Sequence, residues 1–211
     1  MLNLSLNEVE ATSKRAAKGA GYSWGLAEEA GKATRWLCIQ GYDGISVLAR
    51  LLERELAANP QAHRPKNLDH EWQADHALCP LIAGCALSDC AAQLQSGKTI
   101  LHDVEAPAML LPFASYAARR IEKVVCIEID DLELHCDGIY VDQTQDVLTR
   151  AERVLLTIKE KVTVRAHPAQ TRAFPQDEAW KILSDFAHRT YAPATEDSRM
   201  RGAGAGLSDN D

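Results

Sequence analysis

The sequence has no apolar run long enough to cross a bilayer. A membrane-spanning helix needs about 20 consecutive apolar residues, and even the stretches PLIAGCAL and APAMLLPFASYAA are short and interrupted. The opening residues MLNLSLNEVE turn polar within a few positions and lack the basic segment and apolar stretch of a secretory signal. We therefore expect no membrane association and a cytoplasmic location.

Basic residues are in deficit as well. The chain carries 23 lysines and arginines against 30 aspartates and glutamates, so its formal net charge is −7 with the histidines neutral. A field of this sign repels phosphate backbones. We therefore expect no nucleic acid among the partners.

The chain also shows no export signal that would favour disulfide bonds, so its cysteines are expected to stay reduced. There are six of them: Cys38, Cys79, Cys85, Cys90, Cys126 and Cys136. Three, at positions 38, 126 and 136, fall in apolar or alternating segments, a setting typical of small buried side chains.

What is present is an average globular composition, with 46% hydrophobic and 25% charged residues over 211 positions. We expect a helical segment over residues 1–58 and an α+β core over residues 59–193 that forms one compact domain with it. A glycine-rich tail follows over residues 194–211. The boundary rests on the segment NPQAHRPKN at 59–67, which has two prolines and no apolar periodicity.

The first part of the chain predicts three helices. Ser5 and Glu8 have the spacing of a capping box before the first helix. A second helix is expected from about Trp24 to Gln40, with Trp24, Ala27, Gly31, Thr34 and Cys38 in one stripe whose small residues allow close approach of another backbone. Asp43 can cap a third helix.

The second part changes to a period of two. The segments VVCIEI, LELHC and IYVDQ predict a β-meander, with Asp137-Gly138 as a hairpin turn. We favour strands for AERVLLTIKEKVTV and expect helices over residues 108–118, interrupted by Pro112, and 176–191. The sequence thus predicts an α+β fold in which an N-terminal three-helix segment packs with an antiparallel β-meander and a C-terminal helix.

The turn from Gly19 to Gly25 is the first candidate for function, because it sets Tyr22, Ser23 and Trp24 before a helix N-terminus. Such an end attracts anions, although aromatic side chains and glycines also suit a packed corner between helices. With Trp36, these three residues are candidate ligand-binding residues. Arg199, beside the alternating glycines of the tail, is a further one, because such glycines can form an anion-binding nest.

The segment from Asp69 to Cys79 is dense in potential metal ligands, and on a helix Asp69, Gln73 and His76 would share a side. It has no second Cys or His pair at finger-like spacing, so we predict no metal site and identify no cofactor.

Nucleophilic and acid–base chemistry have separate candidates. Cys85, with Asp89 nearby in sequence, could be a nucleophile, and His76 or His102 could act as its base if the fold brings them together. The run His102-Asp103-Val104-Glu105 could offer an acid–base pair at the end of an element. The same sequence pattern also fits two non-catalytic interpretations. Cys85 could belong to a tightly packed run of small residues, and His102 could lie in a solvated loop. The candidate catalytic residues are His76, Cys85, Asp89, His102 and Asp103.

The run SLNEVEATSKRAAKGAGYSWGLAEEAGKATRWL and the closing HRTYAPATEDSRMRGAGAGLSDND resemble a family of uncharacterised bacterial proteins, mainly alphaproteobacterial, known as a domain of unknown function. A weaker likeness over Leu4 to about Leu56 is to the N-terminal helices of malate/L-lactate dehydrogenase-like oxidoreductases. Those enzymes place Ser-His-Gly after the aspartate, whereas this chain has Asp43-Gly44-Ile45. The likeness implies a shared packing of helices and does not imply a nicotinamide-dependent reaction.

Two classes of function follow. In the first, the protein is an enzyme of small-molecule metabolism acting on an organic acid or amide in an aromatic-walled pocket. In the second, it is a non-catalytic accessory or assembly subunit that uses the Tyr22–Trp24 helix corner to bind a second copy or another protein.

Overall fold

The computed structural model describes residues 2–142, 144 and 149–191. Within them lie six α-helices and seven strands in two sheets, which confirms the α+β class. None of these helices is long and apolar enough to cross a membrane.

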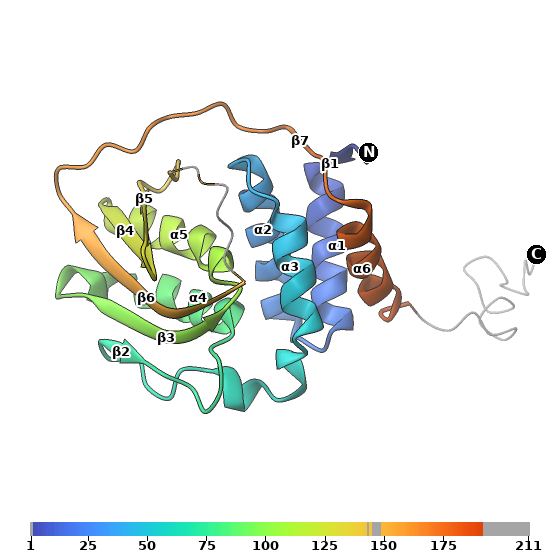
Figure 1. The fold of residues 1–211 in the computed structure, drawn as a ribbon, viewed down its shortest axis with the longest axis horizontal. Coiled ribbons are helices and arrows are strands. Elements are labelled where there is room, and N and C mark those ends of the chain that lie inside the picture. Colours follow the sequence, from blue (N-terminus) through green and yellow to red (C-terminus); the bar gives the residue numbers. More distant parts are fainter. Residues whose placement is uncertain (1, 143, 145–148, 192–211) are drawn as a thin grey trace, which may run out of the picture.

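The helical part of the molecule is built from α1 (Leu6–Gly19), α2 (Trp24–Ile39), α3 (Gly44–Glu53) and α6 (Asp177–His188). Helix α1 packs against α2 and α6, and α3 packs against the same two helices (Figure 1). The predicted caps are confirmed: Ser5 accepts a hydrogen bond from the backbone N–H of Glu8, and Asp43 accepts one from that of Ser46. Two short strands, β1 (Leu4–Ser5) and β7 (Arg172–Ala173), pair with each other. They link the segment before α1 to the segment before α6.

The other part is a five-stranded sheet in the order β2-β3-β6-β4-β5. Its strands are β2 (Glu71–Trp72), β3 (Thr99–Glu105), β4 (Val124–Ile129), β5 (Leu132–Cys136) and β6 (Arg150–Lys159). The β2–β3 pair is parallel and the others are antiparallel. Helix α4 (Pro80–Asp89) and helix α5 (Leu111–Ile121) lie behind the sheet in Figure 1, between it and α2. Short 3-10 turns complete the described elements at Leu56–Ala58, Pro60–His63, Ala91–Gln95 and Pro107–Leu110.

The segment from Asp69 to Cys79 contains strand β2 at Glu71–Trp72, so the shared helical side that Asp69, Gln73 and His76 would have on a helix does not form. Three local predictions were wrong. Trp24 does not belong to the packed stripe of α2, since 58% of its surface is exposed. Pro112 does not interrupt α5 but stands in its first turn, where its missing N–H leaves no hydrogen bond unmade. Tyr191 lies beyond the last residue of α6, His188.

The meander was right for two strands and wrong for the third. Strands β4 and β5 pair as predicted, but after Gly138, which has a φ of +93°, Val141 makes only an isolated bridge to Cys136. The turn itself closes as predicted: the side chain of Asp137 accepts hydrogen bonds from the N–H groups of Ile139 and Tyr140, and the N–H of Asp137 donates to the oxygen of Tyr140 at 3.2 Å. The segment AERVLLTIKEKVTV, predicted as strands, is confirmed as far as Lys159, where β6 ends after pairing with both β3 and β4, whereas residues 160–164 are not in a strand.

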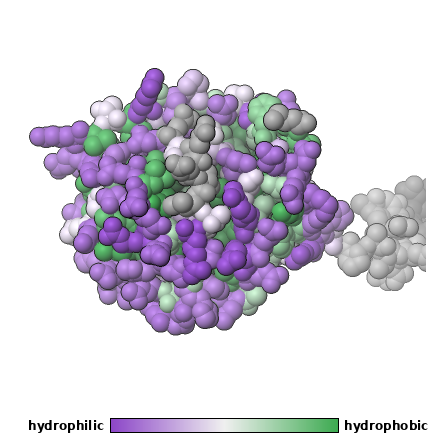
Figure 2. Space-filling view, viewed as in Figure 1, coloured by the Kyte–Doolittle hydropathy of each residue, from purple (hydrophilic) through white to green (hydrophobic). Residues whose placement is uncertain are grey.

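One hydrophobic core runs through both parts and includes Val9, Leu37, Leu52, Phe113 and Ile127. The division at residue 58 therefore stays a prediction, and α6 packs with the N-terminal helices although it comes from the end of the chain. Seen from the side of Figure 1, hydrophilic residues cover most of the surface, with smaller hydrophobic areas between them (Figure 2).

Candidate functional site

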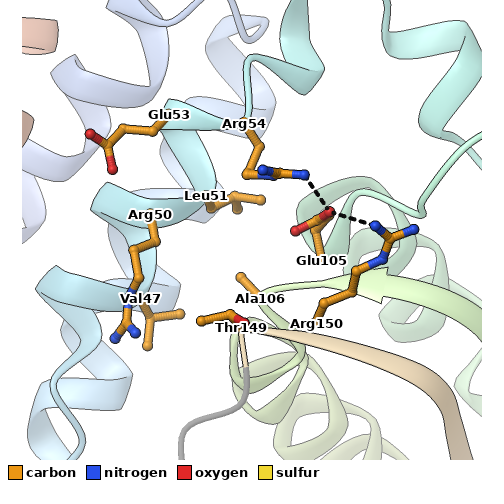
Figure 3. A pocket seen from close by; sticks show the side chains of 9 residues that line it. All are labelled: Val47, Arg50, Leu51, Glu53, Arg54, Glu105, Ala106, Thr149 and Arg150. Atoms are coloured by element: carbon orange, nitrogen blue, oxygen red, sulfur yellow. Dashed lines mark hydrogen bonds and ion pairs between the residues drawn. The ribbon is translucent and has the colours of Figure 1, made fainter.

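A cleft of about 390 Å³ opens between α3 and the neighbouring ends of β3 and β6. Its apolar lining comes from Val47 and Leu51 of α3 and from Ala106, which follows β3 (Figure 3). Its charged lining consists of three arginines and two glutamates: Arg50, Arg54, Arg150, Glu53 and Glu105. The cleft therefore combines a hydrocarbon floor with a surplus of guanidinium groups in a chain whose net charge is −7.

The fold brings these charges together from three elements. Arg50 and Arg54 lie four residues apart at the C-terminal end of α3, a spacing that puts them on one side of a helix. Glu105 is the last residue of β3, and its register partner is Arg150, the first residue of β6. The antiparallel pairing of these strands therefore sets a carboxylate beside a guanidinium at the edge of the cleft.

Glu105 is the most buried charge of the cleft, with 5% of its surface exposed. Its Oε1 lies 3.2 Å from Nη2 of Arg54 and 3.8 Å from Nη1 of Arg150. Arg150 also donates two hydrogen bonds to the carboxylate of Asp103, one of them 2.6 Å from Nη2 to Oδ2. The two arginines thus hold Glu105 in place while about half of each arginine side chain remains open to solvent.

Arg50 differs from the other two arginines. Its Nε donates to the backbone oxygen of Ser46 at 3.2 Å, and among the described residues no carboxylate forms an ion pair with it. Figure 3 shows its guanidinium group beside Val47, away from Glu105. Arg50 is therefore the cation of the cleft whose charge the described residues leave unpaired.

The backbone around Glu105 is strained. Asp103 has a φ of +53° and Ala106 a φ of +42°, a left-handed region that residues other than glycine rarely adopt. The N–H of Ala106 donates to the oxygen of Thr149 at 2.8 Å, which ties the end of β3 to the start of β6. Strain of this kind costs on the order of 1 kcal/mol or more per residue and gathers at functional sites.

The candidate ligand-binding residues before α2 do not share a cavity wall. Tyr22 is 3% exposed, and its hydroxyl lies 3.4 Å from Sγ of Cys79. Ser23 caps α2 by accepting a hydrogen bond from the N–H of Leu26, whereas Trp24 points to solvent, with Nζ of Lys18 5.3 Å from its ring centroid. Trp36, farther along α2, is half-buried against the core.

The candidate catalytic residues are also spread out. His76 is exposed, and its ring lies tilted beside that of His63 at a centroid distance of 5.8 Å, while Asp89 is exposed at the end of α4. His102 lies in β3 with its Nε2 3.8 Å from a carboxylate oxygen of Glu71. Within the described part of the chain, no hydrogen bond or ion pair joins Cys85 to either histidine.

Cys85 is not set up as a thiolate. Burial raises the pKa of its thiol to about 12, and the nearby carboxylates of Glu29 and Asp89 add to the rise. A nucleophilic cysteine needs the opposite, a pKa lowered by a cation or a helix N-terminus. We therefore leave Cys85 out of the proposed site.

Asp103 is the one candidate catalytic residue that the fold brings to the cleft, through its pair with Arg150. Glu105 belongs to the same polar run of the sequence, His102-Asp103-Val104-Glu105, whereas that run contains none of the three arginines. The four-residue spacing of Arg50 and Arg54 was a usable signal. The contribution of Arg150 was not visible, since it depends on the pairing of β3 with β6. Arg199 lies outside the described residues.

A second group of polar side chains lies near the opposite end of β6. Among the described residues, Cys126, Glu133 and His135 are the group whose metal-ligating atoms all come within 4.8 Å of one another.

The comparisons with known proteins bear on the first part of the chain. Residues 4–96 match the model of a family described as "Protein of unknown function (DUF3726)". This match spans α1 to α4 and includes Arg50 and Arg54, but not Glu105 or Arg150. No curated protein and no solved structure matches the chain. The likeness to dehydrogenase helices and the alphaproteobacterial range stay predictions.

Proposed function

We propose that the protein is an enzyme of small-molecule metabolism that binds a compact organic acid in the cleft between α3 and the β3–β6 end. The observation that carries the proposal is Arg50, a cation that the described residues leave unpaired beside an apolar floor. The cytoplasmic location and the absence of nucleic-acid partners belong to the same proposal and rest on the sequence alone.

The charges of the cleft suit a carboxylate ligand. A guanidinium group binds a carboxylate through two parallel hydrogen bonds, which fix orientation as well as supply energy. Arg50 offers this contact without giving up an ion pair, and the exposed parts of Arg54 and Arg150 can add to it. Val47, Leu51 and Ala106 would contact the hydrocarbon part of the ligand, as apolar walls do in metabolite sites.

Glu105 supplies the chemical group of the proposal. It is a carboxylate in a mostly water-excluded position, and two arginines orient it. A side chain so held can accept a proton from a substrate lying within hydrogen-bond reach. Asp103 then acts as a positioning residue, because it holds Arg150 rather than the ligand.

A thermal-shift screen with matched pairs tests the binding step. Each pair consists of a small carboxylic acid and its primary amide, which differ in charge and hardly in shape. We expect acids and not amides to raise the melting temperature, and the rise to be lost in Arg50→Gln. The control, Arg64→Gln, removes an exposed arginine outside the cleft and should keep the rise. Equal shifts for acids and amides, or a full shift in Arg50→Gln, would count against the proposal.

The catalytic step is tested separately with Glu105→Gln. Removing a negative charge from the cleft should leave acid binding equal or tighter, whereas conversion of the bound acid, followed by NMR, should stop. A variant that binds the acid and still converts it would show that Glu105 is not the proton acceptor.

One observation supports the alternative function, that of an accessory subunit. Trp24 is exposed and lies beside Lys18. Exposed tryptophans are enriched in protein interfaces. Sedimentation of the wild type and of Trp24→Ala distinguishes the two functions. A stable oligomer that Trp24→Ala dissociates favours the subunit, and a monomer whose mass the substitution does not change favours the enzyme.

A further inference from the structure

The outer face of the sheet carries a group of polar side chains that the cleft does not use. Cys126 of β4 is the register partner of both His135 in β5 and Thr157 in β6, so the three side chains share one face. Glu133, two residues before His135, points to the same side. Helix α5 covers the other face, where Val125 and Ile127 enter the core.

His135 is oriented as metal-binding histidines are. Its Nδ1 lies 2.8 Å from Oδ2 of Asp142, and the same oxygen accepts the backbone N–H of His135 at 2.9 Å. A carboxylate on Nδ1 fixes the proton on that nitrogen and leaves the lone pair of Nε2 available. Among the described residues, this Nε2 is buried and makes no hydrogen bond.

Two further atoms that could bind a metal ion lie near Nε2 of His135. Oε1 of Glu133 lies 3.2 Å away, and Sγ of Cys126 completes a set in which all three atoms lie within 4.8 Å of one another. In a tetrahedral zinc site, with bonds of about 2.0–2.3 Å, neighbouring ligand atoms are roughly 3.5 Å apart. The His135–Glu133 distance already fits this separation, and a shift of about 1 Å in the Cys126 side chain would close the set.

From this geometry we propose that Cys126, Glu133 and His135 bind one Zn²⁺ per chain, with Asp142 holding His135 from behind. Thiolate, imidazole and carboxylate are the donors that zinc takes in proteins. Three protein ligands leave a fourth position for water, as in zinc sites that carry chemistry rather than only structure.

Two features of the site oppose metal binding. Nζ of Lys159 lies 3.6 Å from the other carboxylate oxygen of Glu133, and the ion must compete with this contact. Burial, helped by the negative charges of Glu133 and Glu128, raises the pKa of the Cys126 thiol to about 11. Binding therefore releases the thiol proton, since the metal takes the thiolate.

The alternative explanation of the same distances is that His135 contacts Glu133 and Asp142 directly, with no metal ion between them. It predicts no metal binding and no role for Cys126. The two explanations therefore give opposite results in a titration of the whole chain with metal.

Cobalt titration of the full-length chain, stripped with a chelator, tests the site. We expect one equivalent of Co²⁺ to give the near-ultraviolet charge-transfer band of a cobalt thiolate, and Zn²⁺ to remove it. Cys126→Ser should abolish the band. Asp142→Asn should weaken binding about 10–100-fold, the usual effect of losing the partner of a metal-bound histidine, and His135→Gln should weaken it further.

The matched control is His102→Gln, which removes another sheet histidine that faces a glutamate. It should leave the cobalt spectrum unchanged. No charge-transfer band in the wild type at saturating Co²⁺ would overturn the proposal, as would a band that persists in folded Cys126→Ser. If Cys126→Ser does not fold, the wild-type spectrum with the His135→Gln titration decides. None of these measurements uses the cleft, so their failure leaves the proposed function untouched.

Discussion

Glu105 is a carboxylate that burial would penalise unless other charges compensated it. Arg54 and Arg150 supply that compensation, but each is more than half exposed, so the pairs are screened by water. The residue therefore contributes a modest amount to stability and keeps its position in the cleft.

Replacing Glu105 with glutamine should lower the free energy of unfolding by about 1 kcal/mol, because the exposed arginines regain water when their partner loses its charge. Chemical denaturation measures the change. Glu53→Gln is the control, since it removes an exposed carboxylate of the same cleft and should change stability by less than about 0.5 kcal/mol. A loss above about 3 kcal/mol would mean that the charge pair is far less screened than its exposure indicates.

Buried thiols give the protein a sensitivity to alkali. Burial raises the pKa of Cys38 and of Cys85 to about 12, against about 8.5 in an unfolded chain. Above pH 8.5 the unfolded chain loses protons that the folded chain keeps, so the free energy of unfolding falls as pH rises. Below that pH these groups contribute their full stability.

The free energy of unfolding should fall less steeply with pH in Cys85→Ala. Losing one titrating thiol reduces the slope by up to about 1.4 kcal/mol per pH unit between roughly pH 9 and 12. Denaturation at a series of pH values measures the slope, and the wild type provides the reference. Identical slopes in the two proteins would show that the Cys85 thiol ionises equally in both states.

At the scale of elements, α1 and α2 are in close contact because Gly31 has no side chain. A Cβ at this position would lie 2.8 Å from the backbone oxygen of Glu10 and 3.2 Å from Cβ of Lys14. The sequence predicted this approach from Ala27 and Gly31. Gly25, at the start of the same helix, has nothing within 4 Å of the corresponding position.

The two glycines therefore predict opposite effects of the same substitution. Gly31→Ala should destabilise by about 1–2 kcal/mol, because a clash with backbone outweighs the gain in helix propensity. Gly25→Ala should stabilise by up to about 1 kcal/mol. Thermal and chemical denaturation measure both, and a stabilised Gly31→Ala would contradict the close packing of α1 on α2.

Elements were predictable where local chemistry decides them. Ser5 and Asp43 cap helices whatever the rest of the chain does, and alternation marked β4 and β5. Trp24 was misplaced because its spacing fits the stripe, while the Ser23 cap at the helix start turns it to solvent. The two-residue strand β2 forms only because β3 lies beside it, so no local signal could have shown it.

At the scale of the whole molecule, the candidate site depends on long-range pairings. The cleft needs α3 to pack beside the end of β3, and it needs β6 to return between β3 and β4. Asp103 and Glu105 could be predicted from the sequence, because they form a polar run at the end of a strand. Their ion pairs with Arg54 and Arg150 could not be predicted, because 51 positions separate Arg54 from Glu105 along the chain.

In the proposed function, the unpaired guanidinium of Arg50 binds an organic carboxylate. Titration calorimetry of the most stabilising acid into the wild type, Arg50→Gln and Arg64→Gln measures this contact. We predict one site per chain in the wild type and in Arg64→Gln, and at least tenfold weaker binding in Arg50→Gln, which corresponds to about 1.4 kcal/mol. Equal affinity in all three proteins would show that Arg50 does not bind the acid.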